Sequence, residues 1–239
     1  MTKTVMNKNP SFMGHFTELN KRIILLIFSL GIAFVPGWIL YDSIIDLLLK
    51  PLFSIGYNHE SLVVHQITEP LQVKILVVFF LAFYISLPII VFNIAAFLIP
   101  AAKTKYIKIS WLLTLISLSF FYGGAYLGYI NIHHGLEFLM SFTDLTVGIR
   151  SQFYFQFIFR FLVFIGIFFQ FPIIITILIL NRVIKVSFLI NRRKEIFILV
   201  LFIAAVITPT GDPVSLLIFT LPVYIFYEIL IFSLKNKFD

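Results

Sequence analysis

The sequence has no cysteine and little charge. None of its 239 residues is Cys, and only 12% are Asp, Glu, Lys or Arg. The missing cysteines exclude disulfide bonds, thiolate metal sites and cysteine nucleophiles. A typical soluble domain is about 25% charged, so the low charge argues against a water-soluble protein. The connections between apolar runs are too short for a second unit, so we expect residues 1–239 to form a single membrane domain.

Motifs of common enzymes and cofactor sites are also missing. The chain has no His-Glu-x-x-His, no Gly-x-Ser-x-Gly and no glycine-rich phosphate loop. His133, His134 and Glu137 are spaced to share a helix face, but no third metal ligand is evident, so we interpret them as a polar outer interface. We therefore expect no enzyme activity, no metal and no cofactor. The net charge of +7 does not indicate nucleic-acid binding, because the basic residues flank apolar runs.

Long apolar runs dominate what is present, and the mean hydropathy is +1.04. A bilayer core of ~30 Å requires about 20 apolar residues per helix. Lipid offers backbone groups no partner, so the spans must be helices. The sequence predicts an all-α integral membrane protein with six transmembrane helices, at residues 23–40, 71–100, 108–132, 151–181, 194–208 and 213–234.

The distribution of Lys and Arg predicts the orientation. Basic residues gather before the first span, between the second and third, between the fourth and fifth, and after the sixth. The other gaps are mainly acidic. The positive-inside rule therefore places both termini on the inner side.

The predicted helices differ in length. The second and fourth exceed a bilayer thickness at ~1.5 Å per residue, and Pro88 and Pro172 should kink them. The fifth and sixth are short, so we expect a concave bundle. Outside the membrane, residues 42–50 followed by Pro51 predict a short helix on the outer interface, and Glu69-Pro70 should open the second span.

Polar groups inside spans are costly in hydrocarbon and therefore notable. Arg160 lies ~14 Å into the fourth span, where it either extends toward the outer surface or pairs with an outer acid such as Glu69. Gln170 lies near the midplane, and Glu228 lies near the inner end of the sixth span. We expect Gln170 and Glu228 to face a shared groove. Glycines at 123, 124 and 128 instead predict close helix packing.

Several short motifs, spread along the chain, together resemble one protein family. The run His15-Phe-Thr-Glu18-Leu-Asn-Lys21-Arg22 before the first span is similar to the TatC family, the membrane receptors of twin-arginine protein translocation. Further similarities follow in order along the chain: Lys50-Pro51-Leu52, Thr68-Glu69-Pro70 with Lys74, Phe97-Leu-Ile-Pro100, residues 120–129, Phe169-Gln170-Phe171-Pro172, Thr208-Pro209 with Asp212, and Leu221-Pro222 with Tyr227-Glu228.

The resemblance implies a receptor that binds twin-arginine signal peptides of folded cargo and nucleates a complex powered by the proton-motive force. The implied partners are single-span TatA- and TatB-type subunits and further copies of the chain. The implied signal-peptide site comprises Glu18, Leu19, Lys21, Phe97, Pro100, Lys103, Lys105 and Tyr106. Arg160, Gln170 and Glu228 would make intramembrane polar or partner contacts, and Pro51, Glu69, Pro70, Pro209 and Asp212 would shape the outer loops.

Three positions depart from the family pattern. The family usually has Arg at the position of Asn20 and Glu at that of Tyr106, and often Glu at that of Gln170. The departures suggest a divergent member. The high Phe and Ile content suggests an AT-rich genome, so we expect the inner membrane of an organelle, a mitochondrion before a plastid, with a bacterial plasma membrane as the alternative.

Two other function classes remain open at this stage. A small secondary transporter or channel subunit would use Arg160, Gln170 and Glu228 as its solute path, although no convincing internal repeat is present. A haem-handling assembly factor would use His133 and His134 as ligands.

Overall fold

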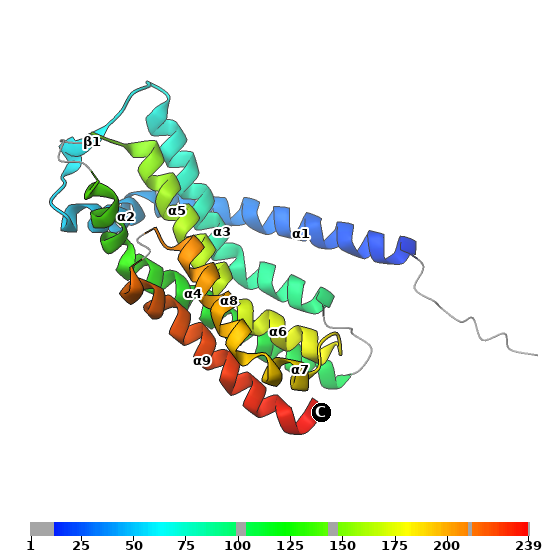
Figure 1. Cartoon of the computed structure of the whole chain (residues 1–239). Helices are drawn as coiled ribbons and strands as arrows, with labels where there is room; N and C mark the ends of the chain where they lie inside the picture. Colours follow the sequence, from blue (N-terminus) through cyan, green and yellow to red (C-terminus); the bar gives the residue numbers. More distant parts are fainter. Residues whose placement is uncertain (1–11, 99–103, 143–147, 210–211, 239) are drawn as a thin grey trace, which may run out of the picture.

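The protein is almost entirely helical (Figure 1). The computed structural model describes the backbone of residues 12–98, 104–142, 148–209 and 212–238, and the side chains of residues 20–95, 111–142, 148–209 and 212–234. The helices are α1 (Phe12–Ile39), α2 (Tyr41–Ser54), α3 (Glu69–Leu98), α4 (Thr104–Met140), α5 (Ser151–Phe168), α6 (Phe171–Leu180), α7 (Val186–Asn191), α8 (Arg193–Ile207) and α9 (Pro213–Phe238).

Within the described residues, five helical stretches are long and apolar enough to cross a membrane: Asn20–Ile39, Glu69–Ala95, Trp111–Met140, Ser151–Leu180 and Pro213–Leu234. The fifth predicted span corresponds to α8, which has only 15 residues. The expectation of a short sixth helix is wrong, because α9 has 26 residues and continues past the apolar run to Phe238. Asp212 sets the start of α9, since its Oδ2 accepts a hydrogen bond from the backbone N–H of Ser215 at 2.8 Å.

The fourth predicted span is broken rather than merely kinked. Pro172 has no N–H, and its ring would clash with the carbonyl of Phe168 in a continuous helix. Accordingly α5 ends at Phe168 and α6 begins at Phe171. Pro88, by contrast, lies inside α3, which continues to Leu98.

The outer connections differ from the prediction in two ways. Pro51 does not end the interfacial helix, because α2 continues to Ser54 and buries Pro51 with Leu48, Leu49 and Leu52. Two short strands were not predicted: β1 (Leu62–Val63) pairs in parallel with β2 (Ile149–Arg150). Strands of two residues leave no alternating pattern in a sequence, so the all-α prediction missed them.

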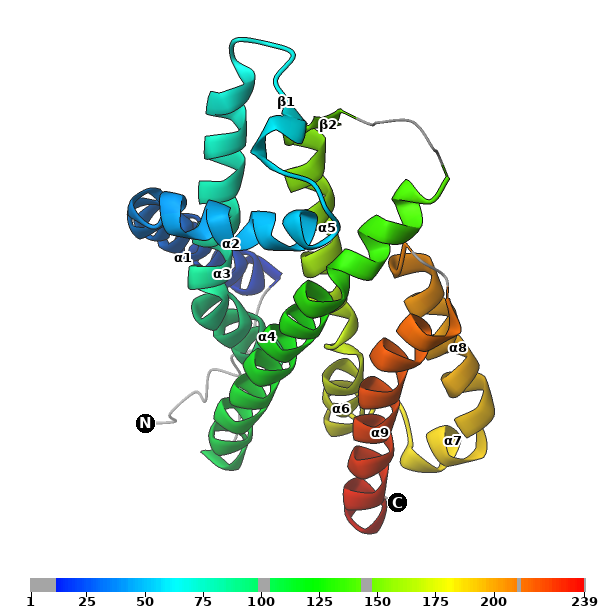
Figure 2. The same cartoon turned by 90° about the vertical axis from the view of Figure 1, so that its left-hand side faces the viewer.

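The core is built around α5. Phe155, Ile158 and Ile165 are at most 2% exposed and belong to one apolar cluster with residues of α2, α3, α4, α8 and α9. Figure 2 shows α4 running between a group formed by α1, α2 and α3 and a group formed by α6 to α9. The predicted close packing of α4 holds at Gly124, against Phe169, and at Gly128, against Leu162 and Ile165.

Candidate functional site

Helices α1 and α3 pack against each other in an antiparallel interface with one register. The hydroxyl of Ser86 on α3 donates to the backbone oxygen of Ser29 on α1 at 3.1 Å. Seven residues earlier in α1 and seven residues later in α3, Arg22 Nη1 donates to the backbone oxygen of Asn93 at 3.2 Å. Ser29, Ser86 and Asn93 are buried. In apolar surroundings such bonds favour a single alignment of the two helices.

This interface leads toward the residues expected to bind a signal peptide. Lys21 is exposed beside it. The backbone is helical at residues 18 and 19 of α1, 97 of α3, and 105 and 106 of α4. The side chains of Glu18, Leu19, Phe97, Lys105 and Tyr106 lie outside the described residues, as do Pro100 and Lys103 entirely.

Gln170 joins the break between α5 and α6 to the middle of α4. Its Nε2 donates to the backbone oxygens of Ser117 at 3.1 Å and Gly166 at 3.4 Å, and the Ser117 hydroxyl donates to its Oε1. Ser117 is 6% exposed, and Gln170 is half-buried. The amide therefore satisfies the Gly166 oxygen at the helix break and joins the break to α4.

Glu228 links the second half of α9 to the start of α8. Its Oε1 accepts a hydrogen bond from the Tyr224 hydroxyl at 2.8 Å, and its Oε2 lies 3.4 Å from Nη2 of Arg193, the first residue of α8. The partners of Glu228 and of Gln170 thus come from different helices. These contacts give no support to the expected shared groove.

Glu69 is paired with Arg150, so the predicted alternative of an Arg160–Glu69 pair is wrong. Glu69 is 0% exposed. Its Oε1 accepts hydrogen bonds from Arg150 Nε at 3.2 Å and from the backbone N–H of Gln152 at 3.3 Å, and its Oε2 accepts from the backbone N–H of His65 at 2.9 Å. The carboxylate therefore ties the start of α3 to the start of α5.

No role was predicted for Arg150 from the sequence. A usable signal existed, because Arg150 is one of few basic residues in the predicted outer gaps, where the charge bias runs the other way. Pro70 follows Glu69 as the second residue of α3, where a missing N–H costs little.

Arg160 has a different environment. Its side chain on α5 is exposed, and the described part of the chain offers it no hydrogen bond or ion pair. Arg160, Gln170 and Glu228 are therefore not linked by shared contacts.

A cation lies between two aromatic rings where α1 ends and α2 begins. The ammonium of Lys74 on α3 is 4.6 Å from the ring centre of Trp38 and 4.9 Å from that of Tyr41. Burial and the neighbouring Asp42 raise the pKa of Tyr41. The ring therefore stays neutral near neutral pH and binds Lys74 through its π face.

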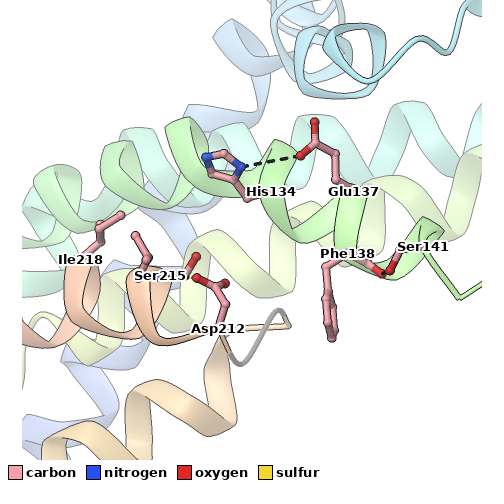
Figure 3. A pocket seen from close by; sticks show the side chains of 8 residues that line it. His134, Glu137, Phe138, Ser141, Asp212, Ser215 and Ile218 are labelled. Atoms are coloured by element: carbon pink, nitrogen blue, oxygen red, sulfur yellow. Dashed lines mark hydrogen bonds and ion pairs between the residues drawn. The ribbon is translucent and has the colours of Figure 1, made fainter.

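A pocket of about 450 Å³ lies where the end of α4 meets the start of α9 (Figure 3). Its polar lining includes His134, Glu137 and Asp212, and His134 Nδ1 lies 3.7 Å from Glu137 Oε2. The described residues contain no group of three or more His, Cys, Asp or Glu side chains that could hold a metal ion. Near this pocket, Pro209 packs closely against Gly135 of α4.

Comparisons with known proteins agree on one family. A family model described as Sec-independent protein translocase protein (TatC) matches residues 14–222. The chain is 30% identical over 248 residues to the Sec-independent protein translocase protein TatCy of Bacillus subtilis, covering 100% of this chain and 93% of the relative. It is 26% identical over 232 residues to TatC of Carboxydothermus hydrogenoformans, covering 96% and 94%. A crystal structure of the twin-arginine translocase receptor TatC superposes with a TM-score of 0.70 at 28% identity, over 92% of this chain and 98% of that one.

Proposed function

The chain belongs to the TatC family of Sec-independent protein translocase proteins, and we propose that it is the translocase subunit that receives twin-arginine signal peptides of folded proteins. The observation that carries this proposal is the match to the TatC receptor over nearly the whole length of both chains. It is a transport component, and no catalytic step is required of it.

The proposed topology has six spans with both termini inside. Support for a sixth crossing comes from the pocket where the start of α9 lies beside the end of α4. Since α4 is the third span, its end is at the outer side, and the start of α9 must be there too. The chain reaches that side from α6 and α7 through α8, although α8 would cover only ~22 Å. Beside so short a helix the bilayer must thin, which suits a concave body.

The register of α1 against α3 supports the position of the signal-peptide site. The step from Ser29–Ser86 to Arg22–Asn93 advances both helices by the same seven residues. Both helices continue, and four further residues along each lead to positions 18 and 97. This register supports the proposal that Glu18 and Phe97 belong to one site.

The chemistry of this position fits the proposed ligand. A twin-arginine signal offers two guanidinium groups followed by an apolar helix. Guanidinium groups bind carboxylates in a bidentate geometry, and Glu18 is the only carboxylate before the first span. Leu19 and Phe97 would contact the apolar part, with Lys21, Pro100, Lys103, Lys105 and Tyr106 at the border.

The same comparison supports a proposal for the membrane location and the partners of the protein. All the relatives named above are bacterial, so the expected mitochondrial or plastid location receives no support, and we place the protein in a bacterial plasma membrane. TatA- and TatB-type single-span subunits and further copies of the chain are the proposed partners. We expect the intramembrane polar residues Arg160, Gln170 and Glu228 to influence such contacts.

Site-directed crosslinking tests the receptor site. A photo-reactive amino acid at position 18 or 19 should capture a twin-arginine signal peptide, and a twin-lysine version should be captured far less. Loss of a charge-assisted contact of about 1.5–3 kcal/mol corresponds to more than tenfold weaker binding.

The matched control carries the photo-reactive residue at Glu60, which is exposed. The proposed topology puts Glu60 on the opposite side of the membrane, so this control should capture neither peptide. Equal capture of both peptides at position 18 would contradict the proposal, and so would capture of neither.

A further inference from the structure

Arg160 is a charged side chain in the part of α5 that is long and apolar enough to cross a membrane. It lies ~14 Å along the helix from Ser151. Its side chain is exposed, and no described residue forms a hydrogen bond or an ion pair with it. A bare guanidinium in hydrocarbon is costly, so an anion or water must accompany it. Gln156, one turn earlier, adds a second donor beside it.

Two grooves meet at Arg160. The first, between α3 and α5, has a volume of about 330 Å³. Its lining surface is apolar, and the aliphatic stem of Arg160 contributes to it beside side chains such as Phe79, Phe83 and Val163. The second, between α5 and α8, has about 440 Å³ and is lined by Gln156 and Arg160 together with aromatic residues and Val206 and Ile207. We call these the α3–α5 groove and the α5–α8 groove.

The short helix α8 determines the depth of Arg160 relative to the lipid. Val206 and Ile207 are the last two residues of α8, so Arg160 lies at the level where this helix ends. A helix of 15 residues covers ~22 Å, less than the ~30 Å of a bilayer core. Lipid next to α8 must therefore thin, and headgroups of the outer leaflet reach toward the level of Arg160.

We propose that Arg160 and Gln156 bind the phosphate of an outer-leaflet phospholipid, with one acyl chain in the α3–α5 groove. Guanidinium groups favour phosphate because two parallel N–H···O bonds form at once. The apolar lining of the α3–α5 groove suits a flexible acyl chain. This inference does not depend on the signal-peptide site at the other side of the membrane.

Native mass spectrometry of the full chain, purified in detergent, provides the test. Dioleoylphosphatidylglycerol is the probe, and dioleoylglycerol has the same chains without phosphate. The phospholipid should bind more tightly than dioleoylglycerol. Arg160→Gln should weaken phospholipid binding about tenfold, and Arg160→Lys should weaken it less, because a point charge replaces the bidentate fork. Lys185→Gln, which also removes one exposed positive charge, should leave binding unchanged.

A second variant tests the groove without touching the charge. Val163→Trp should fill the α3–α5 groove and weaken binding of both lipids while Arg160 stays in place. The proposal is overturned if Arg160→Gln binds the phospholipid as well as the wild type does, or if dioleoylglycerol binds equally tightly. It is also overturned if Arg160→Gln loses co-purified single-span subunits but keeps the lipid, since the anion would then be a carboxylate of a partner helix.

Discussion

Replacing Gly124 by alanine should destabilise the protein, whereas the same change at Gly123 should not. A Cβ at position 124 would lie 2.6 Å from Cγ and 2.8 Å from Cδ2 of Phe169. Phe169 is 3% exposed, so its ring cannot move aside freely. A Cβ at position 123 would meet no described atom within 4 Å. The two glycines are neighbours on α4 and form a matched pair.

The expected magnitude follows from two contributions. Both substitutions gain helix propensity of about 0.5–1 kcal/mol, and this contribution cancels in the comparison. Only the alanine at 124 overpacks the interior, which typically costs about 1–3 kcal/mol. At about 2–4 °C per kcal/mol for a chain of this size, Gly124→Ala should melt about 2–12 °C below Gly123→Ala.

The difference in melting temperature is measured on the detergent-purified variants, with size-exclusion chromatography as the readout of folded protein after heating. The new methyl group would displace the ring of Phe169, which directly precedes Gln170 in the chain. Export of a twin-arginine reporter should therefore also fall for Gly124→Ala. Adding Phe169→Leu should restore part of the lost melting temperature by making room for the new methyl group. Equal melting of the two alanine variants would refute the packing argument.

Three further results are expected. In a double-mutant cycle, Gln170→Leu and Ser117→Ala should show a coupling free energy of about 0.6–1.7 kcal/mol in unfolding titrations, and strict additivity would exclude an energetic link. Arg150→Gln should loosen the start of α3 around the buried Glu69 carboxylate, seen as faster hydrogen exchange at its N-terminal amides than in Arg192→Gln, and equal rates would argue against this role. Because the chain lacks cysteine, single cysteines can report topology: one at Glu60 should react with a membrane-impermeant maleimide added from outside and one at Arg192 should not, and the reverse pattern would overturn the orientation.

The sequence by itself determined the features that depend on local chemistry. Hydrocarbon leaves a backbone no partner but itself, so long apolar runs had to become helices. A kink at Pro172 was predicted from one missing N–H and one ring, although the structure shows a complete break there. The close contact at Gly124 follows from a missing side chain at helical spacing. The family was also recognisable, because the order of short motifs along the chain survives even where single positions such as Asn20 differ.

Only the tertiary structure decided which polar groups meet. Glu69 could have paired with Arg160 or with Arg150, and the β1–β2 contact brings Arg150 to it. Gln170 depends on Ser117, which is 53 residues away, and Glu228 depends on Arg193 of another helix. Such pairs are set by how helices pack against one another, and a single sequence contains no direct record of those distances. For the same physical reason Arg160, left without a partner among the described residues, was revealed as a candidate lipid site only by the grooves that surround it.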